Sequence, residues 1–304
     1  MTQTILGASG QIAVELAHEL HRHHTTDLRL VSRSPRALHP TDEVVAADLL
    51  DAAQARNAVA GSEIVYFTAG LPPKTELWEQ QFPTMLRNSL DAARAAGAAF
   101  AYFDNTYMYP QDDRVQTEDT PFAPVGRKGR VRAEMADMVL AEMERGAIPV
   151  LIARAPEFYG PGRTQSFTNT LVIDRLRAGK RALVPVSADR RRSLIWTPDA
   201  SRALAVLGNS PDAYGQTWHL PVDDVRPTYR EIVEAFTADG QLTVVPAWAF
   251  RALGLVSPEA REIRELLPRY GHDNLFDDSQ FRARFPDFRV NSIREGLDAL
   301  AREA

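Results

Sequence analysis

The 304-residue sequence contains no cysteine, which excludes disulfide bonds, cysteine nucleophiles and thiolate metal sites. It has no apolar run of the ~18–20 residues that a membrane-spanning helix needs. The first ten residues lack a basic stretch followed by an apolar one, so we expect no secretory signal. Lys and Arg number 35 against 40 Asp and Glu, so the net charge of −5 offers no excess positive charge to attract nucleic acid. These absences predict a cytoplasmic protein that binds neither membranes nor nucleic acid.

Short apolar segments alternate with helical patterns in the first half of the chain. Parallel strands need crossover helices between them, and such helices cover both faces of the sheet. The sequence therefore predicts an α/β fold, a Rossmann-type doubly wound parallel sheet. We predict strands at 2–6, 28–32, 44–46, 64–67, 100–103 and 150–154, and helices at 11–20, 49–59, 77–96 and 130–145, the third of them interrupted near Pro83.

The pattern changes after residue 155, where loops rich in Pro and Gly begin. We expect residues 1–155 to form a nucleotide-binding domain and residues 156–304 a smaller, mostly helical substrate-binding lobe over the carboxyl edge of the sheet. Strands and helices near the boundary can belong to either part. Beyond 155 we predict strands at 182–186, 193–196 and 217–220, helices at 167–178, 198–207 and 229–238, and a mostly helical stretch over 247–304.

A glycine-containing turn joins the first strand to the first helix, in the run Gly7-Ala8-Ser9-Gly10-Gln11-Ile12-Ala13. A tight turn at this point needs the first glycine, and a close approach of the backbone to a pyrophosphate needs the second. The helix N-terminus supplies free N–H groups for the same anion. This context predicts a dinucleotide site that includes Gly7, Ser9, Gly10, Gln11 and Ile12.

The second strand ends without an acidic residue, in Val31-Ser32-Arg33-Ser34-Pro35-Arg36. An NAD site usually has an acid here for the ribose 2′-hydroxyl, whereas a guanidinium suits a 2′-phosphate. Arg33 and Arg36 therefore indicate NADP(H) as the preferred cofactor, with NAD(H) as the alternative; both arginines also fit a solvated loop. Asp48, followed by Leu49, is expected to accept from the adenine amino group, and it also fits a helix N-cap.

Over residues 2–240 the chain resembles the extended short-chain dehydrogenases/reductases of the NAD-dependent epimerase/dehydratase type. The similar segments are 7–13, Asp48-Leu49, Thr68-Ala69-Gly70, the run from Arg154 to Gly162 and residues 191–200. The resemblance implies a Rossmann fold, cofactor contacts at 68–70 and at Pro156 and Phe158, and a substrate contact at Tyr159. It does not identify a substrate.

The catalytic positions depart from that family. Its Ser-Ser-x-x-Val-Tyr-Gly run aligns with Asp104 to Pro110, which puts Asn105, with Thr106 beside it, where the family has Ser or Thr. The family's Tyr-x-x-x-Lys, followed four residues later by Glu, aligns with Gly126, Arg130 and Glu134. We therefore expect the tyrosine to be absent and Arg130 to hold the nicotinamide ribose. An alternative register with Lys128 as the lysine puts Pro124 at the tyrosine position.

Several aromatic and basic residues are candidates for the substrate side. Tyr107 and Tyr109 fit a general acid near Arg130 or Lys128, but a role as lining or packing residues is favoured for both. We name Asn105, Thr106, Tyr107 and Arg130 as candidate catalytic residues, and Tyr107, Tyr159, Arg191 and His219 as candidate substrate contacts. Arg191 belongs to a run of three arginines that fits either an anion clamp or a solvated turn, and His219 also fits a hydrogen-bonded core histidine. The histidines at 18, 21, 23 and 24 have no carboxylate at useful spacing, so we expect no metal site.

Two functional hypotheses follow. The first is an NADP(H)-dependent oxidoreductase or epimerase-like enzyme, a monomer or homodimer, that acts on a carbonyl or sugar-like small molecule with non-standard acid/base residues. The second is a catalytically inactive NADP(H)-binding sensor or regulatory protein. The intact phosphate loop and the missing tyrosine agree with both.

Overall fold

A seven-stranded parallel sheet forms the centre of the computed structural model, which describes residues 2–162, 164, 166–237, 240–253, 257, 261–262 and 264–302. The strand order is β11-β7-β5-β4-β1-β2-β3, and every neighbouring pair is parallel. This confirms the predicted fold class. The strands are β1 (Gln3–Leu6), β2 (Leu28–Ser32), β3 (Glu43–Ala46), β4 (Ile64–Phe67), β5 (Ala99–Asp104), β7 (Val150–Arg154) and β11 (Thr217–His219).

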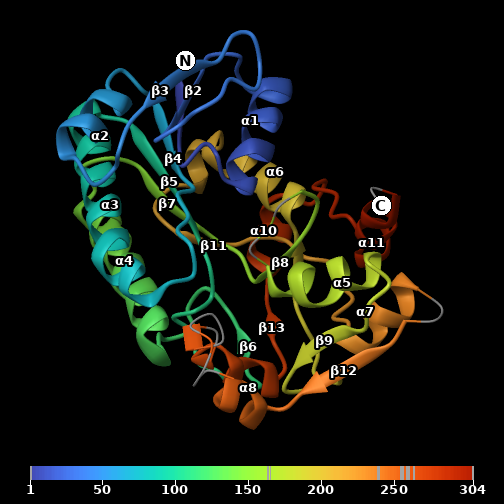
Figure 1. The fold of residues 1–304 in the computed structure, drawn as a ribbon. Coiled ribbons are helices and arrows are strands. Elements are labelled where there is room, and N and C mark those ends of the chain that lie inside the picture. The colour runs from blue at the N-terminus through green and yellow to red at the C-terminus, as the bar shows by residue number, and fades with distance from the viewer. Residues whose placement is uncertain are drawn as a thin grey trace.

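Helices cover both faces of this sheet (Figure 1). α1 (Gln11–His23) packs on α6 (Thr197–Gly208) over one face, while α2 (Ala52–Val59), α3 (Thr75–Ala96) and α4 (Gly126–Arg145) pack side by side over the other. Each face has its own buried apolar core because strands buried on both sides carry apolar residues almost continuously. β11 and α6, which follow residue 155, belong to this sheet and its covering layer.

Two helices differ from their predicted form. α2 begins at Ala52 and not at 49, because the carboxylate of Asp51 accepts from the backbone N–H groups of Ala53 and Gln54. α3 runs without the predicted interruption through Pro83 and ends at Ala96, followed by Gly97 with a φ of +66°. No helix in the described part of the chain is long and apolar enough to cross a membrane.

The described part of the smaller lobe contains three short parallel strand pairs. These are β8 (Glu157–Tyr159) with β10 (Leu194–Trp196), β9 (Ala182–Pro185) with β12 (Leu242–Val245), and β6 (Val115–Gln116) with β13 (Leu275–Phe276). β6 precedes residue 155, so a piece of the first part of the chain completes the second. The helices are a π-helix at Thr168–Ile173, α5 (Asp174–Arg177), α7 (Tyr229–Phe236), α8 (Ala247–Leu253), α10 (Ser279–Arg284) and α11 (Ile293–Arg302), with 3-10 turns at Pro211–Ala213 and Leu267–Gly271.

Candidate active site

The turn between β1 and α1 is shaped by two glycines. Gly7 has a φ of +89°, and a Cβ atom on it would lie 2.5 Å from the Cα atom of Ala69. The backbone N–H of Gly10 donates to the carbonyl of Gly7 over 3.0 Å, and α1 begins at the next residue without a side-chain cap. The N–H groups of the first helical turn are therefore available to an anion at the carboxyl edge of the sheet.

The end of β2 lies against this turn. The hydroxyl oxygens of Ser9 and Ser32 are 2.9 Å apart, which ties the phosphate loop to the following Arg33. The side chains of Arg33 and Arg36 are exposed, and neither forms an ion pair with any carboxylate in the described ranges. Both guanidinium groups are thus free to meet a phosphate beside the loop.

Asp48 and Leu49 follow β3 on the same edge. The Asp48 carboxylate accepts from the backbone N–H of Leu50 over 3.0 Å. Since Asp51 caps α2, the alternative in which Asp48 is the helix cap is wrong, and the adenine contact stays a prediction. The Leu49 side chain is buried in the core, and its carbonyl accepts from the side-chain amide of Asn88 over 2.9 Å.

Residues 68–70 directly follow β4 and lie beside the glycine turn between β1 and α1. The Thr68 hydroxyl donates to the carbonyl of Leu6 over 2.9 Å, which fixes the start of the segment. Ala69 fills the space beside Gly7, and a Cβ atom on Gly70 would meet nothing within 4 Å. The segment therefore leaves open space directly beyond the glycine turn.

Gln11, Ile12, Pro156 and Phe158 lie where the sheet meets the smaller lobe. The Gln11 amide donates to Thr197 over 2.9 Å and to the carbonyl of Pro161 over 2.5 Å, so its side chain ties the two parts together. Ile12 and Phe158 are half-buried against the core under α1, and Pro156 is buried. Their cofactor contacts stay predictions.

A network of buried charged side chains lies at the carboxyl end of β5. The Asp104 carboxylate, only 1 % exposed, accepts from Arg132 over 2.6 Å and from Arg154 over 3.2 Å. Both guanidinium groups are more than nine-tenths buried. Arg154 also donates to the hydroxyl of Tyr109 over 2.6 Å. One carboxylate therefore balances two buried cations at the carboxyl edge of the sheet.

Asn105, Thr106 and Tyr107 follow this network at the mouth of the site. The Asn105 side-chain oxygen accepts from the backbone N–H of Tyr107 over 3.0 Å, so Asn105 caps the end of the strand. The hydroxyl of Thr106 accepts from Arg269 over 3.0 Å. The Tyr107 ring stacks on Trp78 at 6.1 Å between centroids, and the guanidinium of Arg269 lies 4.8 Å from the centroid of the same ring.

The predicted register of α4 needs correction. Arg130 is on the exposed face of the helix, and a Cβ atom on Gly126 would lie 2.5 Å from a carboxylate oxygen of Glu265. A larger side chain at position 126 would displace Glu265, and the φ of +77° there favours glycine. The inward-facing residues one turn apart are instead Lys128 and Arg132, because the N-terminal part of α4 turns these positions toward the edge of the sheet.

Lys128 is completely buried and joins the two lobes. Its ammonium donates to the Thr75 hydroxyl over 2.7 Å and to the carboxylate of Glu262 over 2.5 Å, and lies 3.1 Å from that of Glu265. The same carboxylates accept from the backbone N–H groups of Thr75 and Arg127 at the starts of α3 and α4. The sequence pattern contained no signal for this cluster, since Glu262 and Glu265 lie more than 130 positions from Lys128.

His219 is a fully buried core histidine. Its Nδ1 lies 2.7 Å from the carbonyl oxygen of Asp277 and must donate there, so Nε2 accepts from the Tyr109 hydroxyl at 2.7 Å. Burial, followed by the charge of Arg154, lowers the pKa of His219 to about 3, and burial raises that of Tyr109 to about 12. The prediction that His219 contacts substrate is therefore wrong, and Tyr109 is a packing residue.

The buried neutral state of His219 predicts a pH dependence of stability. The histidine stays neutral in the folded protein down to about pH 3, but it takes up a proton below pH ~6.5 when unfolded. The contribution of neutral His219 to the free energy of unfolding is complete above pH 6.5. It falls by about 1.4 kcal/mol per pH unit as the pH drops toward 3. His219→Gln lacks this titration. Urea unfolding should show the difference in unfolding free energy, wild type minus variant, falling by about 2 kcal/mol from pH 6.5 to pH 5; a constant difference would refute the assignment.

Tyr159 and Arg191 do not face the site. Tyr159 is 1 % exposed and packs on Trp196 in the core of the smaller lobe, where a Cβ atom on Gly296 would touch its ring. Arg191 is exposed on the outer surface. The neighbouring Arg192 points inward and pairs with Glu157. Both substrate contacts proposed from the sequence are therefore corrected, because Tyr159 is buried in the core of the smaller lobe and Arg191 does not line the cavity described next.

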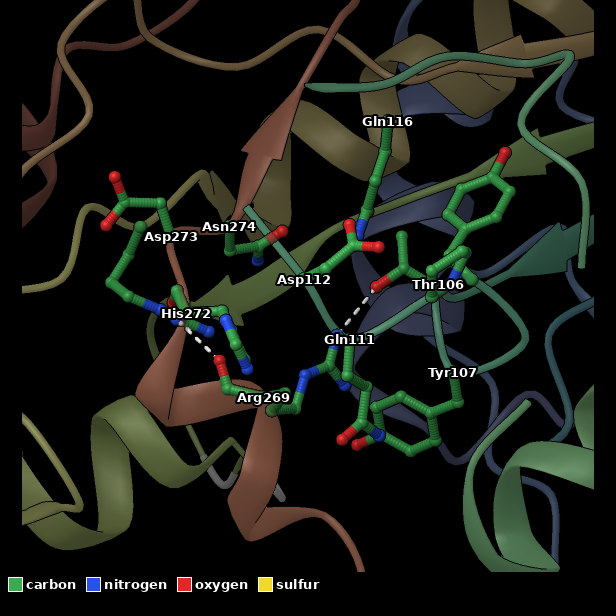
Figure 2. Close-up of a pocket in the computed structure, with 12 residues that line it drawn as sticks. Thr106, Tyr107, Gln111, Asp112, Gln116, Arg269, His272, Asp273 and Asn274 are labelled. Carbon is green, nitrogen blue, oxygen red and sulfur yellow. Dashed lines mark hydrogen bonds between the residues drawn. The ribbon is translucent and has the colours of Figure 1, made fainter. Parts of the chain in front are cut away.

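A narrow cavity opens beside Thr106 and Tyr107 (Figure 2). Its free volume is about 10 Å³, room for roughly one water molecule, and it is partly open to solvent. Its walls come from residues 106–116 on one side and from Arg192 and residues 269–274 on the other. The part of the chain that the structure describes contains no group of three His, Asp or Glu side chains that could hold a metal ion.

Comparisons with known proteins agree with this architecture. The model of the NAD dependent epimerase/dehydratase family matches residues 4–220. A partial consensus L-threonine 3-dehydrogenase superposes with a TM-score of 0.80 at 17 % identity, covering 100 % of this chain and 99 % of that chain. UDP-glucuronic acid 4-epimerase from Bacillus cereus, solved with NAD, gives 0.80 at 14 % identity with the same coverage.

UDP-N-acetylglucosamine 4-epimerase from Bacillus cereus gives a TM-score of 0.76 at 13 % identity, again covering 100 % and 99 % of the two chains. At these low sequence identities, the solved structures show a shared fold and nothing more. No curated protein sequence matches the chain. Since the family model covers most of the chain, the protein belongs to the NAD-dependent epimerase/dehydratase family.

Proposed function

We propose that the protein is an NADP(H)-dependent oxidoreductase or epimerase-like enzyme for a carbonyl or sugar-like small molecule. The observation that carries this proposal is the glycine turn at 7–10. A Cβ atom on Gly7 would collide with Ala69, and α1 starts uncapped, so the turn leaves backbone N–H groups free for a pyrophosphate. We further propose that it acts in the cytoplasm as a monomer or homodimer.

In this proposal the cofactor lies along the carboxyl edge of the sheet. Its adenosine end meets Arg33, Arg36 and Asp48, and its nicotinamide end passes residues 68–70 toward Thr106. The cofactor supplies the hydride. The Thr106 hydroxyl and Arg269 are the polar groups that stand where a substrate carbonyl would enter, and Arg269 is fixed over the Tyr107 ring.

The exposed Arg33 carries the proposed preference for NADP(H). Arg33→Ala removes a charge-assisted contact to the 2′-phosphate, so calorimetric titration should show NADPH binding about 10–100-fold more weakly, which corresponds to about 1–3 kcal/mol. NADH affinity should hardly change. Arg87→Ala, which removes another exposed arginine on α3, is the control and should bind both cofactors like the wild type. Equal affinity of the wild-type protein for NADPH and NADH would contradict the preference.

One observation favours the second candidate, a sensor that binds NADP(H) without turnover. Lys128, which faces inward one turn before Arg132, is sealed by Glu262 and Glu265 and has no exposed surface. NADPH oxidation against a panel of aldehydes, ketones and sugars separates the two candidates when combined with binding followed by intrinsic fluorescence. Turnover supports the enzyme, binding without turnover supports the sensor, and absence of binding contradicts both.

A further inference from the structure

Residues 264–273, here named the strap, cross the mouth of the candidate site and lead into β13. The second half of the strap supplies the cavity wall that faces Thr106 and Tyr107 (Figure 2). The free volume between these walls is about 10 Å³, whereas pockets for small molecules enclose roughly 300–1,000 Å³. Neither a nicotinamide ring nor a small carbonyl compound fits beside Thr106 while the strap stays in this position.

The start of the strap is held at the N-terminus of α4. One carboxylate oxygen of Glu265 accepts from the backbone N–H of Arg127 over 2.7 Å, and the other lies 3.1 Å from the buried ammonium of Lys128. Glu262, which precedes the strap, accepts from the same ammonium over 2.5 Å. When the strap moves away, water replaces the Glu265 carboxylate as the partner of these N–H groups, so the contact is reversible.

The middle and the end of the strap meet the sheet domain through contacts of the same kind. Arg269 donates to the hydroxyl of Thr106 over 3.0 Å, and its guanidinium lies 4.8 Å from the centroid of the Tyr107 ring (Figure 2). The backbone N–H of Asp273 donates to the exposed carboxylate of Asp113 over 2.7 Å. Water can replace each of these partners as well.

A buried aromatic residue anchors the strap to the smaller lobe. Tyr270 is 3 % exposed, belongs to the apolar core of that lobe and packs against Phe167 with 6.2 Å between the ring centroids. Leu266 and Leu267 are also buried, and neither belongs to the cores that the described residues form on the two faces of the sheet. Separation of the strap from the sheet domain therefore breaks polar contacts and keeps the packing of Tyr270.

We propose that the strap is an autoinhibitory closure, which keeps the nicotinamide end of the dinucleotide away from Thr106 until the strap has left α4. The adenosine end is not affected, because Arg33 follows β2, which lies three strands, roughly 14 Å, from β5. The affinity for whole NADPH is reduced in proportion to the fraction of molecules in which the strap is open. This proposal rests on the proposed function and adds the regulation of the same site.

The test locks the strap with a disulfide, for which the cysteine-free chain is a clean background. A Cβ atom on Gly126 would lie 3.1 Å from the Cβ atom of Glu265, close to the roughly 3.5–4.5 Å between the Cβ atoms of a disulfide. The double variant Gly126→Cys with Glu265→Cys is examined after treatment with oxidised glutathione and after reduction by dithiothreitol. Calorimetric titration measures binding of NADPH and of adenosine 2′,5′-bisphosphate, which contains the adenosine end alone.

The oxidised double variant should bind NADPH at least about tenfold more weakly than the reduced one, and no more tightly than it binds adenosine 2′,5′-bisphosphate. Both forms should bind adenosine 2′,5′-bisphosphate equally. The single variants Gly126→Cys and Glu265→Cys cannot form the bond within one molecule, so dithiothreitol should not change their affinities. Equal NADPH affinity of the oxidised and reduced double variant, with the disulfide verified by mass, would overturn the proposal.

Glu265→Gln tests the proposal in the opposite direction and without a disulfide. Glutamine removes the charge that attracts Lys128, while Glu262 remains as the counterion of the ammonium. The closed form is thereby weakened, so NADPH should bind about threefold to tenfold more tightly and adenosine 2′,5′-bisphosphate as in the wild type. Glu144→Gln, an exposed glutamate on α4, is the matched control and should bind both like the wild type. Unchanged or weaker NADPH binding in Glu265→Gln would contradict an autoinhibitory role.

The two nucleotides also separate this proposal from the proposed function. If neither nucleotide binds to any form of the protein, the proposed function fails and the closure proposal fails with it. If both nucleotides bind, and the state of the strap does not change their affinities, the closure proposal alone fails and the proposed cofactor site stands.

Discussion

Replacing Asp104 by asparagine is expected to lower the free energy of unfolding by about 3–5 kcal/mol. Asp104 is the single carboxylate between the buried guanidinium groups of Arg132 and Arg154. Asparagine keeps the size of the side chain but removes its charge, which leaves two cations buried without a counterion. Urea unfolding followed by circular dichroism measures the change.

Asp91→Asn is the matched control for this experiment. Asp91 pairs with Arg94 on the surface of α3, where its side chain is 54 % exposed, so its loss should cost at most about 1 kcal/mol. A similarly small effect for Asp104→Asn would show that the network at the end of β5 does not depend on the carboxylate charge.

Gly7→Ala is expected to weaken NADPH binding at least about 100-fold, corresponding to roughly 3 kcal/mol. The added methyl group would lie 2.5 Å from the Cα atom of Ala69, so residues 68–70 or the turn itself must move out of the cofactor path. Titration of NADPH by fluorescence measures the loss, with circular dichroism to confirm that the variant is folded.

Gly61→Ala is the control that separates the steric collision expected in Gly7→Ala from the strain of an alanine at a positive φ. Gly61 also has a positive φ, +74°, but a Cβ atom there would meet nothing within 4 Å. Its replacement should therefore cost only the strain of a left-handed alanine, on the order of 1 kcal/mol of stability, and should leave NADPH affinity unchanged. Equal NADPH affinity in Gly7→Ala and wild type would remove the turn from the cofactor site.

The parts of the fold that follow from local sequence were predicted correctly. The strand before Gly7 and the helix after Gly10 show periodicities that neighbouring residues determine, and both were found. The register of α4 was misjudged because the alignment depended on Glu134, which lies on the exposed face of the helix. The residues around α4 in the sequence carry no information about Glu262 and Glu265, which contact Lys128 in the folded chain.

The walls of the cavity could not be predicted for the same reason. Arg269 meets Thr106 across 163 positions, and Asn274 reaches Glu157 across 117. The pairing of β6 with β13 brings residues near 115 next to residues near 275. The bridge of Asn274 to Arg192, which precedes β10, brings Asn274 close to Glu157 on the paired strand β8. The run of three arginines showed that a cation was present, but only the structure shows that Arg192 points inward while Arg191 is exposed.

A crystal structure of the protein with NADPH tests the central claim most directly. We expect the pyrophosphate over the turn from Gly7 to Gly10, the 2′-phosphate within about 3.5 Å of the Arg33 guanidinium, and the nicotinamide ring at the mouth of the cavity beside Thr106 and Tyr107. Density for the nucleotide away from the glycine turn would contradict the account, as would a nicotinamide ring directed away from this cavity.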